Sequence, residues 1–246
     1  MGHEDLEKLR EYIKGLKEIT ISFSGGVDSS FLAKVAFEEL GKKATAITVA
    51  NEFTCEDDIL NSIEIAKKIG IRHKIIKINI LTEEIEKNSE DRCYLCKLNI
   101  LSAIEGKNIA DGTTVDDNPE DRPGMVALEE MGVVSPLKEC GLGKEKIRKL
   151  AKELGLPNYN KPSNSCLATR IPFNSKITKE KLEKIDAAET ILKKKGISGA
   201  RAKLKDSSFL IELPSKEITK YKNSKKEIED EIYQLDINEI KLGERK

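Results

Sequence analysis

The chain has 246 residues, of which 35% are charged and 38% hydrophobic, and its 43 basic and 43 acidic side chains cancel. This composition is typical of a folded chain and excludes a disordered one, and the balanced charge argues against a nucleic-acid partner. The polar residues 1–5 do not resemble a signal peptide, and no apolar run approaches the ~20 residues of a membrane span. We therefore expect a cytoplasmic protein without a membrane partner.

Apolar runs rich in β-branched residues alternate with segments of helical period along the first two-thirds of the chain. The predicted strands are residues 18–23, 44–50, 73–78, 107–111 and 132–135. The predicted helices are residues 4–16, 29–40, 57–68, 94–104, 124–131 and 144–154. This alternation predicts an α/β fold, a parallel sheet with helices on both faces, in which ligands bind at the carboxyl ends of the strands.

The pattern changes near residues 172–178. A predicted helix over residues 179–195 is followed by strands at 201–205 and 209–213, which are joined by a hairpin turn. A charged helical segment at 216–234 and a last strand at 237–242 complete the chain. We predict two domains, with residues 1–172 in the first and residues 173–246 in a small C-terminal α+β subdomain.

The sequence SGGVDSS at residues 24–30 stands between the first predicted strand and the second predicted helix. Glycines in such a turn let backbone N–H groups approach a phosphate, and the helix N-terminus adds about half a positive charge. Ser24, Ser29 and Ser30 add hydroxyl donors, and Asp28 has the chemistry to hold Mg²⁺. The lysine of the kinase and GTPase phosphate loop is missing, so this is a different phosphate-binding motif.

Three cysteines lie close to basic residues in the sequence. Cys93 and Cys96 form a C-x-x-C pair, and Cys166 is followed by Arg170. The pair alone is compatible with a redox centre, half of a zinc site or two ligands of an iron–sulfur cluster. Three cysteines around a 4Fe-4S cluster leave one iron open to an exogenous sulfide. Cys55 and Cys140 are interpreted as small, inert residues.

Several motifs in order resemble a known family. The loop at 24–30 resembles the PP-loop, SGGxDS, of the N-type ATP pyrophosphatases. RCYLCK at 92–97, ADGTTVDD at 110–117, RPG at 122–124 and KPSNSCLATRIP at 161–172 follow it. Together they resemble the LarE-type ATP-dependent sulfur transferases of the PP-loop superfamily over about residues 5–215.

The resemblance implies an activity. Members adenylate a carboxylate of a pyridinium dicarboxylate mononucleotide, release pyrophosphate and replace AMP with sulfur, and the product becomes a nickel-pincer cofactor. In one branch the cysteine that matches Cys166 gives up its own sulfur. In another, three cysteines hold a 4Fe-4S cluster that takes sulfide from a sulfide source. Since Cys93, Cys96 and Cys166 occupy all three positions, we expect the cluster branch, and a homo-oligomer.

The resemblance also implies residue roles. The residues expected to bind ATP are Ser24, Gly25, Gly26, Ser29 and Ser30 at the pyrophosphate portion, Val49 and Ala50 at the adenine, and Gly112 and Thr113 at the ribose or α-phosphate. Asp28, beside Mg²⁺, and Cys166 are the predicted catalytic residues. Arg170 and Arg201 are candidates to bind the phosphate of the substrate, because a guanidinium group binds phosphate in a bidentate fork. Glu189 is a candidate to line the same pocket. The alternative for Arg201 is an exposed charge on a strand, and for Glu189 a solvated glutamate on a helix.

Some alternatives remain open from the sequence. Asp116 and Asp117 either hold a second metal or cap a turn. An amide-forming PP-loop synthetase needs the same ATP loop but no cysteines. A tRNA thiolation enzyme needs both, although the neutral charge disfavours it. A nucleotide-binding regulator with a structural zinc is the non-enzymatic alternative.

Overall fold

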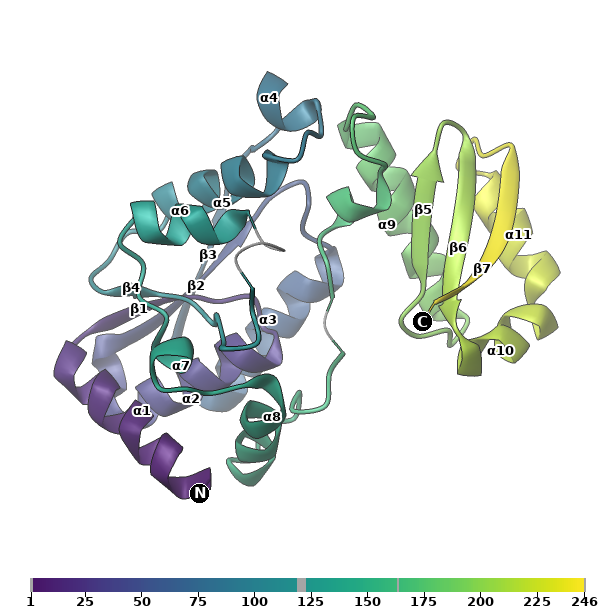
Figure 1. Ribbon diagram of the computed structural model, residues 1–246. Coiled ribbons are helices and arrows are strands. Elements are labelled where there is room, and N and C mark those ends of the chain that lie inside the picture. Colours follow the sequence, from purple (N-terminus) through teal and green to yellow (C-terminus); the bar gives the residue numbers. More distant parts are fainter. Residues whose placement is uncertain (1, 119–122, 163, 246) are drawn as a thin grey trace. The chain divides into compact units, whose positions relative to one another are not determined.

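The computed structural model describes residues 2–118, 123–162 and 164–245 (Figure 1). They form two compact units, the first from residues 1–80 and 90–164 and the second from residues 81–89 and 165–246. The sequence predicts a single boundary after residue 172, whereas residues 81–89 and 165–172 group with the second unit. Arg122 and Ser163, which belong to two of the family motifs, lie outside the described residues.

A four-stranded parallel sheet forms the centre of the first unit, in the order β3-β2-β1-β4. Its strands are β1 (Ile19–Ser22), β2 (Ala44–Ala50), β3 (Arg72–Lys77) and β4 (Ile109–Ala110). The predicted strand at 107–111 shortens to two residues, and Asn108 at its start has a φ of 45°, outside the β region. The predicted strand at 132–135 is reduced to a parallel bridge between Val134 and Ala110.

Helices cover both faces of this sheet, which confirms the predicted fold class (Figure 1). One face packs against α1 (Gly2–Leu16), α2 (Val27–Leu40), α3 (Glu56–Ile69) and α8 (Lys144–Glu153), and the other against α5 (Arg92–Ser102) and α6 (Gly124–Glu130). A short helix, α7 (Pro136–Glu139), follows the Val134 bridge. Ala46 and Ile47 of β2 join opposite cores, as the alternation of side chains along a strand requires.

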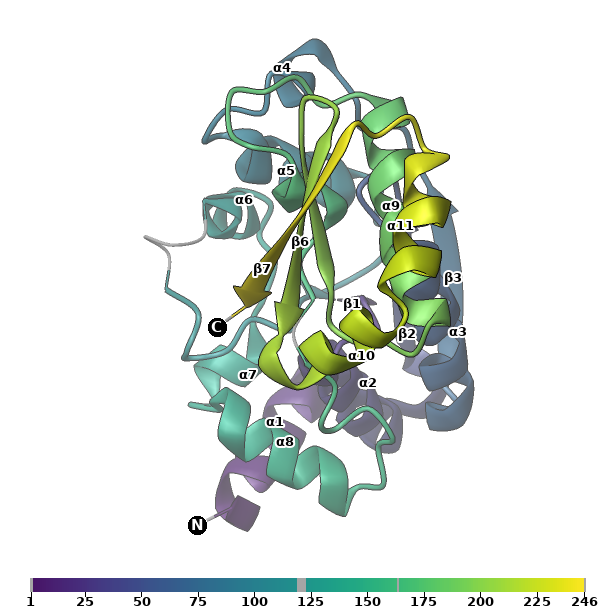
Figure 2. The same ribbon diagram turned by 90° about the vertical axis from the view of Figure 1, so that its right-hand side faces the viewer.

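The second unit is the α+β subdomain that the sequence predicts (Figure 2). Its sheet has the order β5-β6-β7, with β5 (Arg201–Lys205) antiparallel and β7 (Glu239–Arg245) parallel to β6 (Ser208–Pro214). Its helices are α4 (Glu83–Glu86), α9 (Lys179–Lys194), α10 (Ile218–Asn223) and α11 (Lys225–Tyr233), with 3₁₀ turns such as η3 (Leu167–Arg170). No helix in the described ranges is both long and apolar enough to cross a membrane.

Residues 81–89 are fixed to the second unit by hydrogen bonds with residues 171–177. The Asn88 amide Nδ2 donates to the carbonyl oxygens of Pro172 (2.7 Å) and Ile171 (3.3 Å), and the N–H of Asn174 donates to the Asn88 carbonyl oxygen (3.0 Å). Asn88 is fully buried. The chain therefore leaves the first unit after β3, contributes α4 to the second unit and returns to begin α5.

Candidate active site

The SGGVDSS loop connects the end of β1 with the first turn of α2, as the sequence predicts. Gly26 is the N-cap residue of α2, in extended conformation, and it has no side chain that could satisfy the first N–H groups of the helix. The hydroxyl oxygens of Ser24 and Ser29 lie 3.1 Å apart, and the Gly26 N–H donates to Ser24 Oγ at 3.3 Å. The loop thus presents N–H groups and hydroxyls at a helix N-terminus, which is suited to bind phosphate.

Gly25 sets the shape of this loop. Its φ is +71°, and an added Cβ would lie 2.8 Å from Asn61 Nδ2 and 2.9 Å from Ser62 Cα, so only glycine fits. Its carbonyl oxygen accepts hydrogen bonds from Asn61 Nδ2 (2.9 Å) and Asn158 Nδ2 (3.0 Å). Asn158 also donates to Ser30 Oγ at 3.0 Å. Neither asparagine is predicted from the sequence, because they lie 36 and 133 residues from Gly25 and belong to no short motif.

A second loop, which follows β4, packs directly against the start of α2. An added Cβ on Gly112 would lie 2.9 Å from the backbone nitrogen of Ser29, so the close approach requires glycine. The Asp111 carboxylate accepts hydrogen bonds from the N–H of Thr113 (3.1 Å) and from Ser135 Oγ (2.9 Å). These bonds hold the predicted ribose or α-phosphate residues, Gly112 and Thr113, beside the PP-loop.

The two loops line a cavity of about 200 Å³ that is open to solvent. It is lined by Ser22, Ser24, Gly26, Asp28, Ser29, Lys97, Asp111, Gly112, Thr113 and Asp117. Lys97 comes from α5, and its Nζ lies 3.8 Å from Asp111 Oδ2. Carboxylate oxygens suit Mg²⁺, which commonly uses one or two of them together with phosphate oxygens. The cavity therefore combines a phosphate-binding loop, one ammonium group and carboxylates of the kind that bind Mg²⁺.

Asp116 and Asp117 act within the structure as capping residues, one of the two readings that the sequence left open. Asp116 accepts a short hydrogen bond from the N–H of Lys144, at the start of α8. Asp117 Oδ2 accepts from the N–H of Thr114 at 2.9 Å, and its Oδ1 accepts from Lys144 Nζ at 2.8 Å. Both carboxylates thus hold this loop against the start of α8, and Asp117 lines the cavity.

Cys93 and Cys96 lie on α5, the helix that also supplies Lys97. Residues three apart share a helix face, and both thiols are partly exposed. A guanidinium nitrogen of Arg92 lies 3.5 Å from Cys93 Sγ. Cys166 belongs to the second unit, where it is exposed and is the N-cap residue of η3. The described residues contain no group of three or more His, Cys, Asp or Glu side chains placed to hold a metal.

Arg170 and Glu189 form a buried ion pair in the second unit. Arg170 Nε donates to Glu189 Oε1 at 2.7 Å and Nη2 to Oε2 at 3.2 Å, while Nη1 donates to Thr169 Oγ1 at 2.7 Å. The Arg170 side chain is 1% exposed. Glu189 Oε1 also accepts from the N–H of Ala202 in β5 at 3.0 Å. The pair therefore ties the segment after Cys166 to the edge of the sheet.

Arg201 differs from Arg170 in its surroundings. Its Nε is buried and has no hydrogen-bond partner in the described part of the chain. Burial, and then the charges of Arg245 and Arg170, lower the pKa of the Arg201 guanidinium. A guanidinium in this positive environment is suited to receive an anion.

Comparison with known proteins places the chain in a family. The sequence model of the NAD synthase family matches residues 4–107. Uncharacterized proteins of Synechocystis sp. and Methanocaldococcus jannaschii are 35% and 36% identical, covering 90% and 89% of this chain and 85% and 86% of those proteins. The pyridinium-3,5-bisthiocarboxylic acid mononucleotide synthase of Lactiplantibacillus plantarum is 30% identical over 84% of this chain and 78% of its own length. The chain belongs to the LarE-type family of PP-loop proteins. It is an enzyme that uses ATP.

In this LarE-type enzyme the predicted adenine residues lie at the carboxyl end of β2. The Ala50 carbonyl oxygen accepts from the N–H of Ile78 at 3.0 Å, and the Val49 side chain packs against the core under α5 and α6. Their contacts with ATP stay a prediction, as do the substrate roles of Arg170, Arg201 and Glu189.

The remaining cysteines have ordinary environments. Cys55 is buried and is the N-cap residue of α3. Cys140 is half-buried, and burial raises the pKa of its thiol, which keeps it protonated and unreactive. These environments favour the interpretation of both residues as inert.

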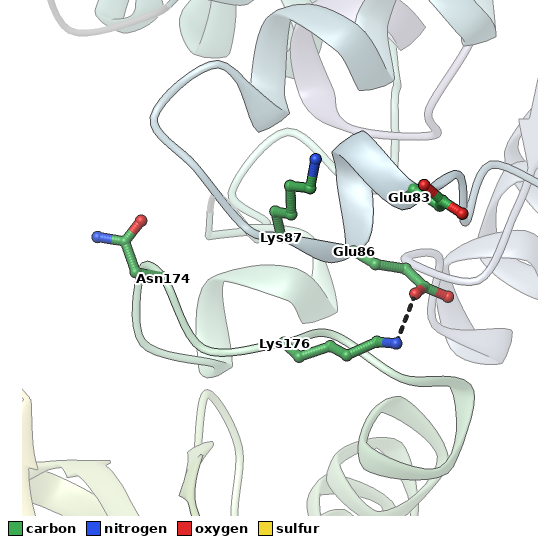
Figure 3. A pocket seen from close by; sticks show the side chains of 5 residues that line it. All are labelled: Glu83, Glu86, Lys87, Asn174 and Lys176. Carbon is green, nitrogen blue, oxygen red and sulfur yellow. Dashed lines mark ion pairs between the residues drawn. The ribbon is translucent and has the colours of Figure 1, made fainter.

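A second cavity, of about 620 Å³, lies in the second unit where residues 81–89 meet residues 174–176 (Figure 3). It is lined by Glu83, Glu86, Lys87, Asn174 and Lys176, and Lys176 Nζ lies 3.0 Å from Glu86. Two carboxylates and two ammonium groups give the lining no net charge. We assign it no role in the chemistry.

Proposed function

We propose that this LarE-type enzyme is an ATP-dependent sulfur transferase that acts on a carboxylate of a pyridinium dicarboxylate mononucleotide-like acid. The similarity to a synthase whose name specifies a bisthiocarboxylic acid mononucleotide supports this substrate class. The use of ATP in this reaction is supported by one observation above all. The N-terminus of α2, which no side chain caps, lies at a cavity that is also lined by Lys97 and Asp28.

The first step is adenylation. A carboxylate oxygen of the substrate attacks the α-phosphorus of ATP, the bond to the β-phosphate oxygen breaks, and pyrophosphate leaves. The carboxylate is already a nucleophile, so positioning and charge neutralisation are the main requirements. The N–H groups at the start of α2 and the Lys97 ammonium supply positive charge. Asp28 would hold Mg²⁺, which neutralises the phosphates.

The second step is sulfur transfer. A sulfur nucleophile attacks the acyl carbon and AMP leaves with the bonding electron pair, which gives a thiocarboxylate. We propose Cys93, Cys96 and Cys166 as the three residues that would hold a 4Fe-4S cluster, which would supply the sulfide. Support comes from the common face and partial exposure of the α5 pair and from the exposure of Cys166. The alternative is that Cys166 donates its own sulfur.

Arg201 is the proposed ligand of the substrate phosphate, because its Nε is buried and has no partner among the described residues. Arg170 and Glu189 remain candidates for the same site. In the structure they form an ion pair with each other. This pair holds the segment after Cys166 against β5, whose Ala202 N–H donates to Glu189.

The test is anaerobic purification followed by iron and acid-labile sulfide analysis. Wild type and Cys140→Ala, the matched control, are expected to be brown and to contain equal iron. Cys93→Ala, Cys96→Ala and Cys166→Ala are expected to lose most of it. A colourless wild type that cannot be reconstituted would refute the cluster. Loss of one H₂S mass at Cys166 after turnover would establish the sacrificial route.

An amide-forming synthetase is the second candidate, since the NAD synthase model matches residues 4–107, which include the PP-loop. Such an enzyme would use ammonia in place of sulfide and would need no cysteine. Full activity of Cys166→Ser with ammonia would support it. A tRNA thiolation enzyme would bind tRNA at physiological salt, which a filter-binding measurement decides.

A further inference from the structure

The segment that follows α8 is held to the first unit by the side chain of Arg148. Two nitrogens of this guanidinium bind two backbone carbonyl oxygens: Nη1 donates to Tyr159 and Nη2 to Lys161, both at 2.9 Å. A guanidinium can make both bonds because its donors form a rigid fork, whereas the ammonium of a lysine is a single point charge. We call residues 158–164 the cysteine arm, because Cys166 comes two residues after its end.

The end of the cysteine arm is bound to α3 through Asp58, which lies in the first turn of that helix. Lys161 Nζ lies 3.2 Å from Asp58 Oδ1, and Asn164 Nδ2 donates to Asp58 Oδ2 at 3.0 Å. Both carboxylate oxygens thus bind the arm. A residue spans at most ~3.6 Å of chain, so the Cα atom of Cys166 lies within ~7 Å of the Cα atom of Asn164.

The start of the cysteine arm is bound to the PP-loop. Asn158 Nδ2 donates to the Gly25 carbonyl oxygen and to Ser30 Oγ, at 3.0 Å each. Asn61 of α3 donates to the same carbonyl oxygen at 2.9 Å. The PP-loop, the beginning of α3 and the arm therefore form one hydrogen-bonded network within the first unit. Because a chain that is fixed at both ends has fewer conformations than a free one, this network restricts the positions that Cys166 can reach.

We propose that Arg148 and Asp58 are positioning residues for sulfur transfer, which hold the cysteine arm so that Cys166 stays within reach of the acyl-adenylate. This role rests on the proposed function, in which sulfur comes from Cys166 or from the cluster that it helps to hold. Both residues act through the arm and not on the reacting atoms. The two ends of the arm then have different tasks, since Asn158 shapes the ATP-binding loop while Arg148 and Asp58 fix the segment before the cysteine.

A single-turnover experiment separates the two steps of the reaction. The anaerobically purified chain is loaded with sodium sulfide, desalted and mixed with ATP and the pyridinium dicarboxylate mononucleotide. Quenched samples give the rate constants of pyrophosphate release and of thiocarboxylate formation. Arg148→Ala and Asp58→Ala are expected to slow thiocarboxylate formation about tenfold or more, because misplacement by about 1 Å can cost ~100-fold in rate. Pyrophosphate release should keep its wild-type rate constant.

Three more variants distinguish positioning from a general loss of structure. Lys149→Ala changes the exposed next residue of α8 and should match wild type in both steps. Arg148→Lys keeps the charge without the fork, so it should be nearly as slow in the second step as Arg148→Ala. Asp58→Asn keeps an oxygen that can accept from Asn164 but loses the charge that attracts Lys161, so its rate constant should lie between those of Asp58→Ala and wild type. Urea denaturation gives the free energy of unfolding of each variant.

Hydrogen exchange gives a second measurement, which needs no substrate. The N–H of Lys161 donates to the Asn158 carbonyl oxygen at 3.0 Å. Arg148→Ala is expected to speed exchange at this amide about tenfold, while the amides of β2 keep their wild-type rates. Wild-type exchange in the arm of Arg148→Ala would show that Arg148 does not hold it.

The outcomes separate the positioning role from the proposed function. If Arg148→Ala and Asp58→Ala slow both reaction steps equally, or slow neither, while wild type forms thiocarboxylate, the positioning role is overturned and the proposed function stands. If wild type releases pyrophosphate but forms no thiocarboxylate, the proposed function fails, and the role in sulfur transfer fails with it.

Discussion

Replacing Gly112 with alanine is expected to impair both folding and ATP use, because the added methyl group meets the backbone of α2. The Cβ would lie 2.9 Å from the nitrogen of Ser29 and 3.3 Å from the carbonyl carbon of Asp28. These are main-chain atoms of a helix, which cannot rotate away as a flexible side chain can. Overpacking of this kind costs about 1–3 kcal/mol of unfolding free energy.

The same displacement would move Asp111 and Thr113 away from the first turn of α2. Misplacement by about 1 Å can reduce a reaction rate ~100-fold, so we expect the kcat/KM for ATP to fall by about 10- to 100-fold. The assay is pyrophosphate release with the carboxylate substrate, and urea denaturation gives the free energy of unfolding.

Gly15→Ala is the matched control for this experiment. Gly15 lies inside α1, and an added Cβ meets nothing within 4 Å. Alanine is favoured over glycine in a helix, so this variant is expected to be more stable by about 0.5–1 kcal/mol with unchanged ATP use. If Gly112→Ala matched wild type in both unfolding free energy and kcat/KM, the inferred packing of its loop on α2 would be wrong.

Three further variants test two side-chain interactions described above and one half-buried histidine, His73 of β3. Asn158→Ala removes one of two donors to the Gly25 carbonyl oxygen. We expect the free energy of unfolding to fall by about 1–3 kcal/mol and calorimetry to show weaker ATP binding. An unchanged affinity for ATP would contradict the role of Asn158 in shaping the loop. Arg170→Ala leaves Glu189 without its buried partner. We expect the free energy of unfolding, measured by urea denaturation, to fall by about 3–5 kcal/mol. A fall of less than about 1 kcal/mol would show that the ion pair is dispensable for stability. Burial lowers the pKa of His73, so its neutral form is favoured by folding, and wild-type stability should fall as the pH drops below ~6.5, the usual value. His73→Gln should flatten this part of the pH profile of the urea midpoint, and an unchanged slope would refute the assignment.

The sequence predicts the long, periodic elements well. The strand at 44–50 coincides with β2, because its β-branched, buried residues leave no competing interpretation. The helix predicted at 57–68 corresponds to α3, which ends at Gly70 with a φ of +85°, the left-handed cap that glycine allows. The hairpin at 205–208 also forms, with Asp206 at a φ of +54°. Each of these signals is local in the sequence.

The features that the sequence does not predict are short or depend on distant residues. The helices α4 and α7 have four residues each, too few for a hydrophobic period. Asn158 reaches Gly25 across 133 residues, and no property of its neighbours indicates this contact. The PP-loop, in contrast, is predictable because a strand, a glycine turn and a helix follow each other directly.

The excursion of residues 81–89 has a consequence for genetic dissection of the protein. Because these residues belong with 165–246, the chain passes from one unit to the other at three points, after residues 80, 89 and 164. No single truncation can separate the units. A fragment beginning at residue 165 would lack the buried Ile85 and the Asn88 amide that binds the backbone of Ile171 and Pro172. To express the second unit alone, residues 81–89 would have to be supplied as a fused or permuted segment.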